Sequence, residues 1–209
     1  MTGIVNYGAG NIYSVLTAVR KCGGDAFIVE KAGDLSSADS IILPGVGAFG
    51  DGMNALSGSG LKEALVKSVS GGKPFLGICL GMQLLFSHSD EGDCDGFGII
   101  NGMVRRFSFP AALSIKVPHM GWNVVEAAGP GRELFAGIPS NSMFYFAHSF
   151  YATPDDPGSI AGRTVYGHPF ASVVKIRNIA GVQFHPEKSG DWGLIFIKNF
   201  LEGKWLASE

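Results

Sequence analysis

The fold of this chain is decided by one stretch, Lys73-Pro74-Phe75-Leu76-Gly77-Ile78-Cys79-Leu80-Gly81-Met82-Gln83-Leu84-Leu85-Phe86. The pattern predicts an apolar strand, a sharp turn at Cys79 and then a helix. Gly-x-Cys-x-Gly suits a strained strand-to-helix elbow, because small residues let the backbone pack closely while the central side chain points outward at the end of the sheet. An isolated cysteine in an apolar strand is more often a core residue, but the flanking glycines favour Cys79 as a nucleophile. The positive end of the following helix would favour its thiolate.

The residues around this elbow alternate between strand and helix patterns through the first half of the chain. Strands are predicted over Gly3 to Tyr7, Ala26 to Glu30, Ser40 to Leu43 and Phe75 to Ile78. Helices are predicted over Ile12 to Val19, Ala55 to Val69 and Leu80 to Phe86. Such alternation implies right-handed crossovers, so we expect a doubly wound α/β fold with a largely parallel central sheet and helices on both faces.

The second half has a different texture, with short strand patterns separated by turn residues. They cover Met103 to Phe107, Met143 to Phe150, Ser159 to Tyr166, Ala171 to Arg177 and Gly181 to Phe184. These patterns predict a smaller mixed or antiparallel sheet, followed by a last helix from Leu194 to Trp205. The length of 209 residues suits one domain spanning residues 1–209.

Composition argues against several classes of function. The chain is 46% hydrophobic with a net charge of -2, which gives no basic footprint for nucleic acid. The beginning of the sequence lacks a signal-peptide pattern, and no apolar run approaches bilayer length, so we expect a cytoplasmic protein without a membrane segment. Cys22, Cys79 and Cys94 lack metal-ligand spacing, so neither a disulfide framework nor a metal site is expected.

A cysteine nucleophile needs a base, and His185 is the best candidate. It ends the apolar stretch Gly181-Val182-Gln183-Phe184 and precedes Pro186-Glu187. Strand ends of an open parallel sheet converge on one crevice, so His185 can meet Cys79 there. Glu187 could hold the other imidazole nitrogen and fix its tautomer.

Acyl chemistry also needs hydrogen-bond donors for an oxyanion. Pro44-Gly45-Val46-Gly47 follows the strand Ser40 to Leu43, and its glycines let a peptide N–H turn into the site. We assign one donor to Val46 or a neighbouring amide, of Gly45 or Gly47, and the other to the amide of Leu80.

Three motifs together resemble, in order and spacing, the class I glutamine amidotransferases: Pro44-Gly45-Val46-Gly47, Gly77-Ile78-Cys79-Leu80-Gly81-Met82-Gln83, and Gly181-Val182-Gln183-Phe184-His185-Pro186-Glu187. The resemblance covers essentially the whole chain and implies that family's flavodoxin-like fold. It also implies that Cys79 attacks the side-chain amide of glutamine, that His185 serves the thiol and the departing ammonia, and that Glu187 orients His185. Glutamate and ammonia would result, without a cofactor. Substrate contacts are implied for Gln83 and for backbone groups near Ser149 and Phe150.

Further motifs resemble one branch of this family, whose members pass ammonia to the cyclase subunit of a synthase in histidine biosynthesis. They are Tyr7-Gly8-Ala9-Gly10-Asn11, Pro118-His119-Met120-Gly121-Trp122-Asn123 and Lys188-Ser189. The resemblance implies a heterodimer with that synthase subunit, and the interface residues it implies are Gly8, Ala9, Gly10, Asn11, His119 and Trp122. For His119 a structural role is the alternative. A paralogue that supplies ammonia for surface-sugar amidation would keep the same triad, so the acceptor stays open.

Other readings of single motifs are weaker. Gly8-Ala9-Gly10-Asn11-Ile12-Tyr13 imitates a dinucleotide-binding fingerprint, but Tyr13 replaces the third glycine. Glu91-Gly92-Asp93-Cys94-Asp95-Gly96 resembles a calcium loop without its final glutamate, so we expect a solvated acidic loop. A stand-alone cysteine hydrolase could use the same triad, and turnover of glutamine would distinguish it.

Overall fold

A single mixed sheet forms the centre of the computed structural model, which describes residues 1–207. Its parallel part consists, in spatial order, of β2 (Ala26–Val29), β1 (Thr2–Val5), β3 (Ser40–Gly45), β4 (Phe75–Cys79) and β14 (Ile179–Val182). Every residue of β1, β4 and β14 is buried. Apolar runs of this kind suit parallel strands that helices cover on both faces.

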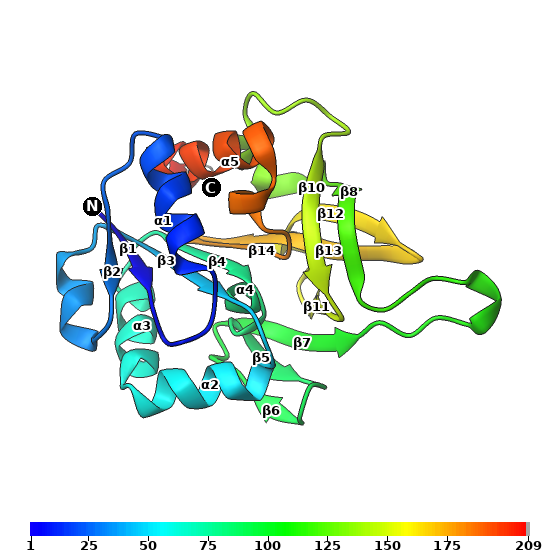
Figure 1. Cartoon of the computed structure of the whole chain (residues 1–209), viewed down its shortest axis with the longest axis horizontal. Helices are drawn as coiled ribbons and strands as arrows, with labels where there is room; N and C mark the ends of the chain where they lie inside the picture. The colour runs from blue at the N-terminus through cyan, green and yellow to red at the C-terminus, as the bar shows by residue number, and fades with distance from the viewer. Residues whose placement is uncertain (208–209) are drawn as a thin grey trace.

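Helices lie on both faces of the parallel strands (Figure 1). One face carries α1 (Ile12–Lys21) and α5 (Gly190–Glu202), and the other carries α2 (Phe49–Gly58) and α3 (Leu61–Ser70). α1 illustrates the cause, because its buried residues Ile12, Val15, Leu16 and Val19 recur at helical spacing and face the sheet. The expected doubly wound α/β architecture is therefore confirmed.

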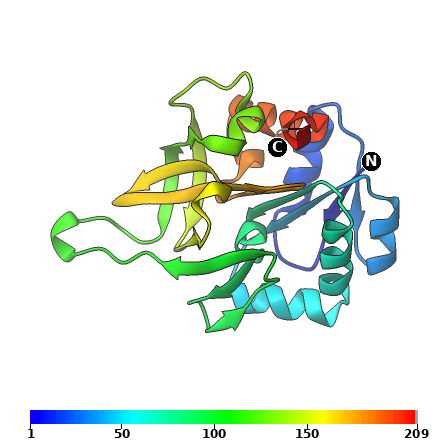
Figure 2. The ribbon, with the colours of Figure 1, turned by 180° about the vertical axis from the view of Figure 1, so that it is seen from behind.

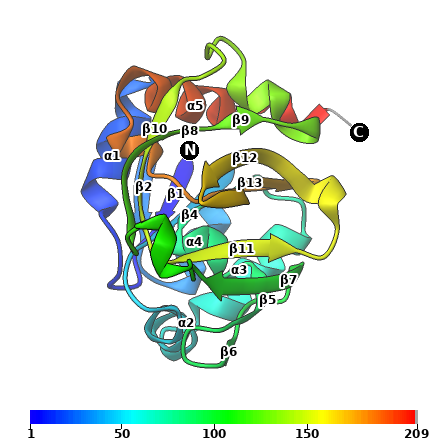
Figure 3. The same ribbon diagram turned by 90° about the vertical axis from the view of Figure 1, so that its right-hand side faces the viewer.

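Antiparallel strands extend the same sheet beyond β14. They are β13 (His168–Ile176), β11 (Phe150–Pro154), β7 (Ile100–Arg106), β12 (Ile160–Tyr166) and β9 (Glu126–Ala127), with β5 (Phe86–Ser89) parallel to β7 and β6 (Cys94–Asp95) at the edge. A separate antiparallel pair, β8 (His119–Val124) and β10 (Met143–His148), packs beside these strands, with β8 next to β12 (Figure 3). This pair is a smaller antiparallel sheet, as expected for the second half, but of the five strand patterns assigned to that sheet it contains only part of Met143 to Phe150. The other four belong to the central sheet, because their strands pair with β14 and its neighbours.

Three predicted elements are divided or shortened in the structure, and the last helix, expected from Leu194 to Trp205, is α5, which begins at Gly190 and ends at Glu202. The helix expected over Ala55 to Val69 is two helices, because Gly60 adopts φ +69° between α2 and α3 and turns the chain. The helix expected from Leu80 is the single turn α4 (Leu80–Gln83), and Phe86 already begins β5. The strand expected over Met143 to Phe150 divides at Ser149 into β10 and β11.

The segment between β7 and β8 projects from the body of the molecule and carries a short 3-10 turn, Ala111–Leu113 (Figure 2). It is tied back where the Tyr166 hydroxyl donates to the carbonyl of Lys116. Among residues 1–207, no helix combines the length and apolar composition needed to cross a membrane.

Candidate active site

The nucleophile elbow lies where β4 runs into α4. Cys79 has φ +53° and ψ -107°, a conformation that L-residues rarely adopt. The backbone of the elbow approaches β3 most closely at Gly81, where a Cβ would lie 1.8 Å from the carbonyl oxygen of Leu43. At Gly77 a Cβ would lie 2.5 Å from the carbonyl oxygen of Gly81. Both glycines are required because the backbone leaves no room for a side chain.

The triad predicted from the sequence is assembled beside this elbow. His185 Nδ1 donates to Glu187 Oε1 at 2.9 Å, and both side chains are almost fully buried. The main-chain N–H of His185 donates to the carbonyl of Tyr145 in β10 at 2.9 Å, which fixes the segment after β14. Cys79 also contributes to the raised pKa of His185, so the two side chains lie close enough to interact. The three side chains therefore form one connected chain of contacts.

The electrostatics of these three side chains favour a charged imidazole. Burial by itself lowers the pKa of His185, but its hydrogen bonds to Cys79 and Glu187 and their negative charges outweigh burial and raise that pKa to about 10. At neutral pH His185 is therefore an imidazolium beside Cys79. The helix after Cys79 has only one turn, so its dipole contributes less to this site than the sequence pattern suggested.

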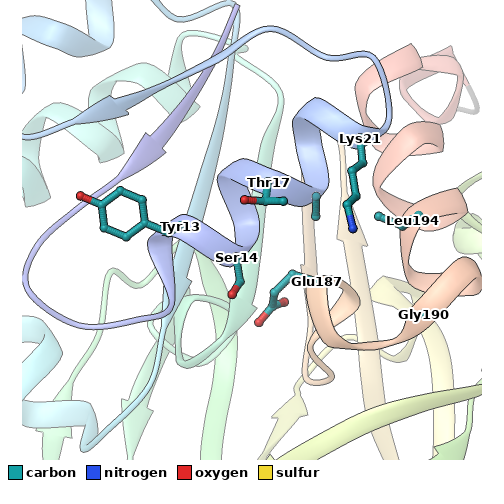
Figure 4. Close-up of a pocket in the computed structure, with 8 residues that line it drawn as sticks. Tyr13, Ser14, Thr17, Lys21, Glu187, Gly190 and Leu194 are labelled. Atoms are coloured by element: carbon teal, nitrogen blue, oxygen red, sulfur yellow. The ribbon is translucent and has the colours of Figure 1, made fainter.

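A pocket lies between α1 and α5, and Glu187 forms part of its wall (Figure 4). Ser14, Thr17 and Lys21 of α1 also line it. Within the described residues, Glu187 Oε2 is buried and has no hydrogen-bond partner. Glu187 therefore directs one oxygen to His185 and keeps the other beside α1.

The cavity in front of Cys79 has a volume of about 230 Å³. Most residues that the sequence predicted for oxyanion and substrate contacts line it: Val46, Gly47, Leu80, Gln83, Ser149 and Phe150. Gly45 pairs with Cys79 in the β3–β4 register and lies beside the elbow. Cys22 and Cys94 are absent from this lining. The structure thus brings the predicted site residues together.

The comparisons with known proteins agree with this geometry. The family model described as glutamine amidotransferase class-I matches residues 3–202. The chain belongs to the class-I glutamine amidotransferases. It is 48% identical to the imidazole glycerol phosphate synthase subunit HisH of Neisseria gonorrhoeae, over 96% of this chain and 98% of that one. It is also 43% identical to the chloroplastic imidazole glycerol phosphate synthase hisHF of Arabidopsis thaliana, where it covers 99% of this chain and 35% of the plant chain.

Among solved structures, the amidotransferase fold is shared with a crystal structure of a glutamine amidotransferase. The TM-score is 0.74 at 19% sequence identity, over 95% of this chain and 98% of that one. At this identity the likeness establishes the fold alone.

Two residues of the amidotransferase site were not identified from the sequence. Glu91, which was expected in a solvated acidic loop, lines the cavity, and its Oε2 accepts from the N–H of Phe49 at the start of α2. Gln183 donates through Nε2 to Cys79 Sγ at 3.6 Å. A sequence signal existed for Gln183, since it lies between the strand and His185. No local signal marked Glu91.

The residues expected at a partner interface fall into two groups. Trp122 is 54% exposed on β8, whereas His119 is only 3% exposed. His119 Nδ1 donates to His148 Nε2 at 3.0 Å, and Asn123 donates to His119 Nε2 at 3.3 Å. Burial lowers the pKa of His119 to about 4, so its ring is neutral and structural, and it offers no free surface to a partner.

The glycine loop at Gly8 to Asn11 lies against the end of β3. A Cβ added at Gly10 would meet the backbone of Pro44 and Gly45 at 3.4 Å. Tyr13, the residue at the third glycine position of a dinucleotide fingerprint, is 73% exposed. Its ring therefore lies away from the contact between helix and strand, so Tyr13 does not obstruct the packing that a third glycine would permit.

Proposed function

We propose that this amidotransferase is the glutaminase subunit of an imidazole glycerol phosphate synthase in histidine biosynthesis. The observation that carries the proposal is the buried arrangement of Cys79, His185 and Glu187 at a cavity of small-molecule size. The relatives support the choice of synthase, because subunit HisH matches along nearly its whole length.

The chemistry follows from the contacts. Cys79 as thiolate attacks the carboxamide carbon of glutamine, and the oxyanion that forms faces the main-chain N–H groups of Leu80 and of Val46 or a neighbour. His185, already an imidazolium, gives its proton to the departing ammonia and leaves a thioester on Cys79. Water activated by the now neutral His185 then releases glutamate, and Glu187 keeps the imidazole aligned in both steps.

The amino-acid end of glutamine would lie deeper along the cavity wall. The carboxylate of Glu91 can pair with the substrate ammonium group, since it is the acidic side chain of that wall. Gln83 is held by donation to the carbonyl of Phe150 at 3.0 Å, which presents this part of the wall in one conformation. Substrate contacts of Gln83 and of the backbone near Ser149 and Phe150 belong to the same proposal.

A synthase subunit would cover the mouth of this cavity. Two exposed apolar side chains, Met120 and Trp122, lie on β8, and Met120 also lines the cavity. Exposed apolar groups beside an active site favour a protein partner. In the plant relative hisHF the matching region is 35% of one longer chain.

Partner binding is expected to raise the activity. The loop Gly8 to Asn11, proposed at the interface, packs against Gly45, and Gly45 adjoins the Val46 oxyanion donor. A partner that presses on this loop can therefore reorient the Val46 peptide. Loss of one oxyanion donor costs ~10²–10³ in rate, which would hold the free subunit nearly silent.

Glutamate release from glutamine tests the proposal in three mixtures: the chain alone, the chain with a cyclase subunit of imidazole glycerol phosphate synthase, and the same pair with the cyclase's ligand. We expect little turnover in the first and the most in the last. Cys79→Ser should abolish turnover and Cys22→Ser should preserve it.

Each outcome separates one part of the proposal. Full activity in the chain alone would show a preformed oxyanion hole and refute activation by the partner. Activation only by a synthase that amidates surface sugars would exclude the histidine pathway while keeping the glutaminase. Absence of glutamine turnover in every mixture would reject the glutaminase itself.

A further inference from the structure

The buried amide of Gln183 joins the nucleophile to the wall of the substrate cavity. Its Nε2 donates to Cys79 Sγ at 3.6 Å, and its Oε1 accepts from Gln83 Nε2 at 3.1 Å. Gln83 in turn donates to the carbonyl of Phe150. The main-chain N–H of Gln183 donates to the carbonyl of Ser172 at 2.9 Å, which anchors the residue. The side chain is therefore held between two partners that need opposite hydrogen-bonding groups.

An amide is the side chain that satisfies both partners. Cys79 as thiolate accepts hydrogen bonds, whereas the Gln83 amide nitrogen donates them. A glutamate at position 183 would place a second negative charge beside the sulfur. An apolar residue would leave the thiolate without this donor and the Gln83 N–H without this acceptor, in a place where Gln183 is fully buried.

The reaction gives this donor a specific task. His185 loses its proton when ammonia departs, so its support for the sulfur changes during the cycle. Gln183 has no proton to lose at neutral pH and remains a donor throughout. It therefore stabilises the thiolate both before the attack and when deacylation releases the sulfur again.

We propose that Gln183 is a catalytic residue of this site. Its amide N–H stabilises the Cys79 thiolate, and its carbonyl oxygen fixes Gln83 in the cavity wall. The role of Gln83 in this inference rests on the proposed glutaminase function. The stabilisation of the Cys79 thiolate can be tested separately, with a reagent that does not need the glutamine cavity.

The test compares wild type, Gln183→Met and Gln183→Glu by the rate at which iodoacetamide alkylates Cys79 between pH 5 and 10, read peptide by peptide with mass spectrometry. We expect Gln183→Met to move the midpoint of the pH–rate curve up by about one unit and to slow alkylation by about tenfold at pH values below the wild-type midpoint, as for the loss of a hydrogen bond to a charged group. Gln183→Glu should move the midpoint further. Cys22 and Cys94 in the same chain are internal controls whose rates should not change.

Steady-state kinetics with the synthase partner then separate the two roles. Both variants should lower kcat. KM for glutamine should rise in Gln183→Met, which removes the acceptor that orders Gln83, and should change less in Gln183→Glu, which keeps an acceptor oxygen. A folded Gln183→Met protein whose Cys79 alkylates with the wild-type midpoint would overturn the proposal, even if its KM rises, because Gln183 would then act through Gln83 alone.

A measurement on unsubstituted Gln183 covers the case in which its variants do not fold. The side-chain amide protons of Gln183, followed by nuclear magnetic resonance, should shift as Cys79 titrates in wild type. In Cys79→Ala protein this pH dependence should be lost. An amide signal that titrates equally in both proteins, or in neither, would also overturn the proposal.

Discussion

Cys79→Gly should give a more stable protein than Cys79→Ala. Cys79 holds φ +53° and ψ -107°, and a non-glycine residue in such a sparsely populated region costs ~1–3 kcal/mol. Glycine relieves that strain but loses about 0.5–1 kcal/mol relative to alanine through its greater freedom in the unfolded chain. The difference leaves Cys79→Gly ahead by about 1 kcal/mol, and within a range of ~0–2.5 kcal/mol.

The comparison uses two variants that have both lost the thiolate, so the charge on His185 changes equally in each. Guanidinium unfolding gives the two free energies of unfolding, and thermal unfolding should show a midpoint about 2–4 °C higher for glycine. Neither variant should turn over glutamine.

Ala64→Gly is the matched control for this pair. Ala64 lies inside α3, where glycine should cost about 1 kcal/mol relative to alanine. The order of stability should therefore be opposite at the two positions. If glycine is less stable than alanine at position 79 by the same amount as at position 64, the elbow stores no backbone strain and the reasoning fails.

Four further predictions concern the triad and the elbow. The pKa of His185, raised to about 10, should fall in Cys79→Ala because the hydrogen bond to the thiolate is lost. Titration of the His185 imidazole by nuclear magnetic resonance measures this pKa. An unchanged value would contradict the assigned cause. Because this pKa lies above 6.5, His185 should stabilise the wild-type fold fully below about pH 6.5 and lose that contribution as the pH rises towards 10. His185→Ala should reduce the rate of glutamine turnover by ~10²–10⁴. Glu187→Gln should reduce it far less, because the amide oxygen of glutamine can still accept a hydrogen bond from His185 Nδ1. Equal losses in the two variants would give Glu187 a larger role. Gly81→Ala should destabilise by about 3 kcal/mol or more, because its Cβ would lie 1.8 Å from the Leu43 carbonyl oxygen; a wild-type unfolding midpoint would show that β3 can yield.

The sequence located the elbow and the triad because their signals are local. The glycines two residues before and after Cys79 indicate, from the sequence alone, that the backbone of the elbow packs closely against its neighbours. His185 and Glu187 are two residues apart, so one short segment specifies both the base and the group that orients it. The alternation of strand and helix patterns likewise predicts layers, since each element must bury its own apolar face.

Element lengths were less predictable from the sequence. Apolar residues continue at helical spacing beyond Gln83, yet Phe86 belongs to a strand because β7 offers it a pairing partner. Gly60 interrupts a helical pattern that propensity alone would carry on to Val69, and its φ of +69° places α3 at an angle to α2. Pairing between strands and packing between helices outweighed local preference in both cases.

The sequence by itself therefore determined the reaction centre, and the tertiary structure decided which side chains support it. Gln183 reaches a cysteine 104 residues away and a glutamine 100 residues away. Glu91 lines the cavity although its neighbours Asp93 and Asp95 are exposed and bonded to His88. Such contacts depend on how β4, β14 and the loop after β5 come together. A one-dimensional pattern records residue types and spacings, whereas these roles depend on distances that only the folded backbone sets.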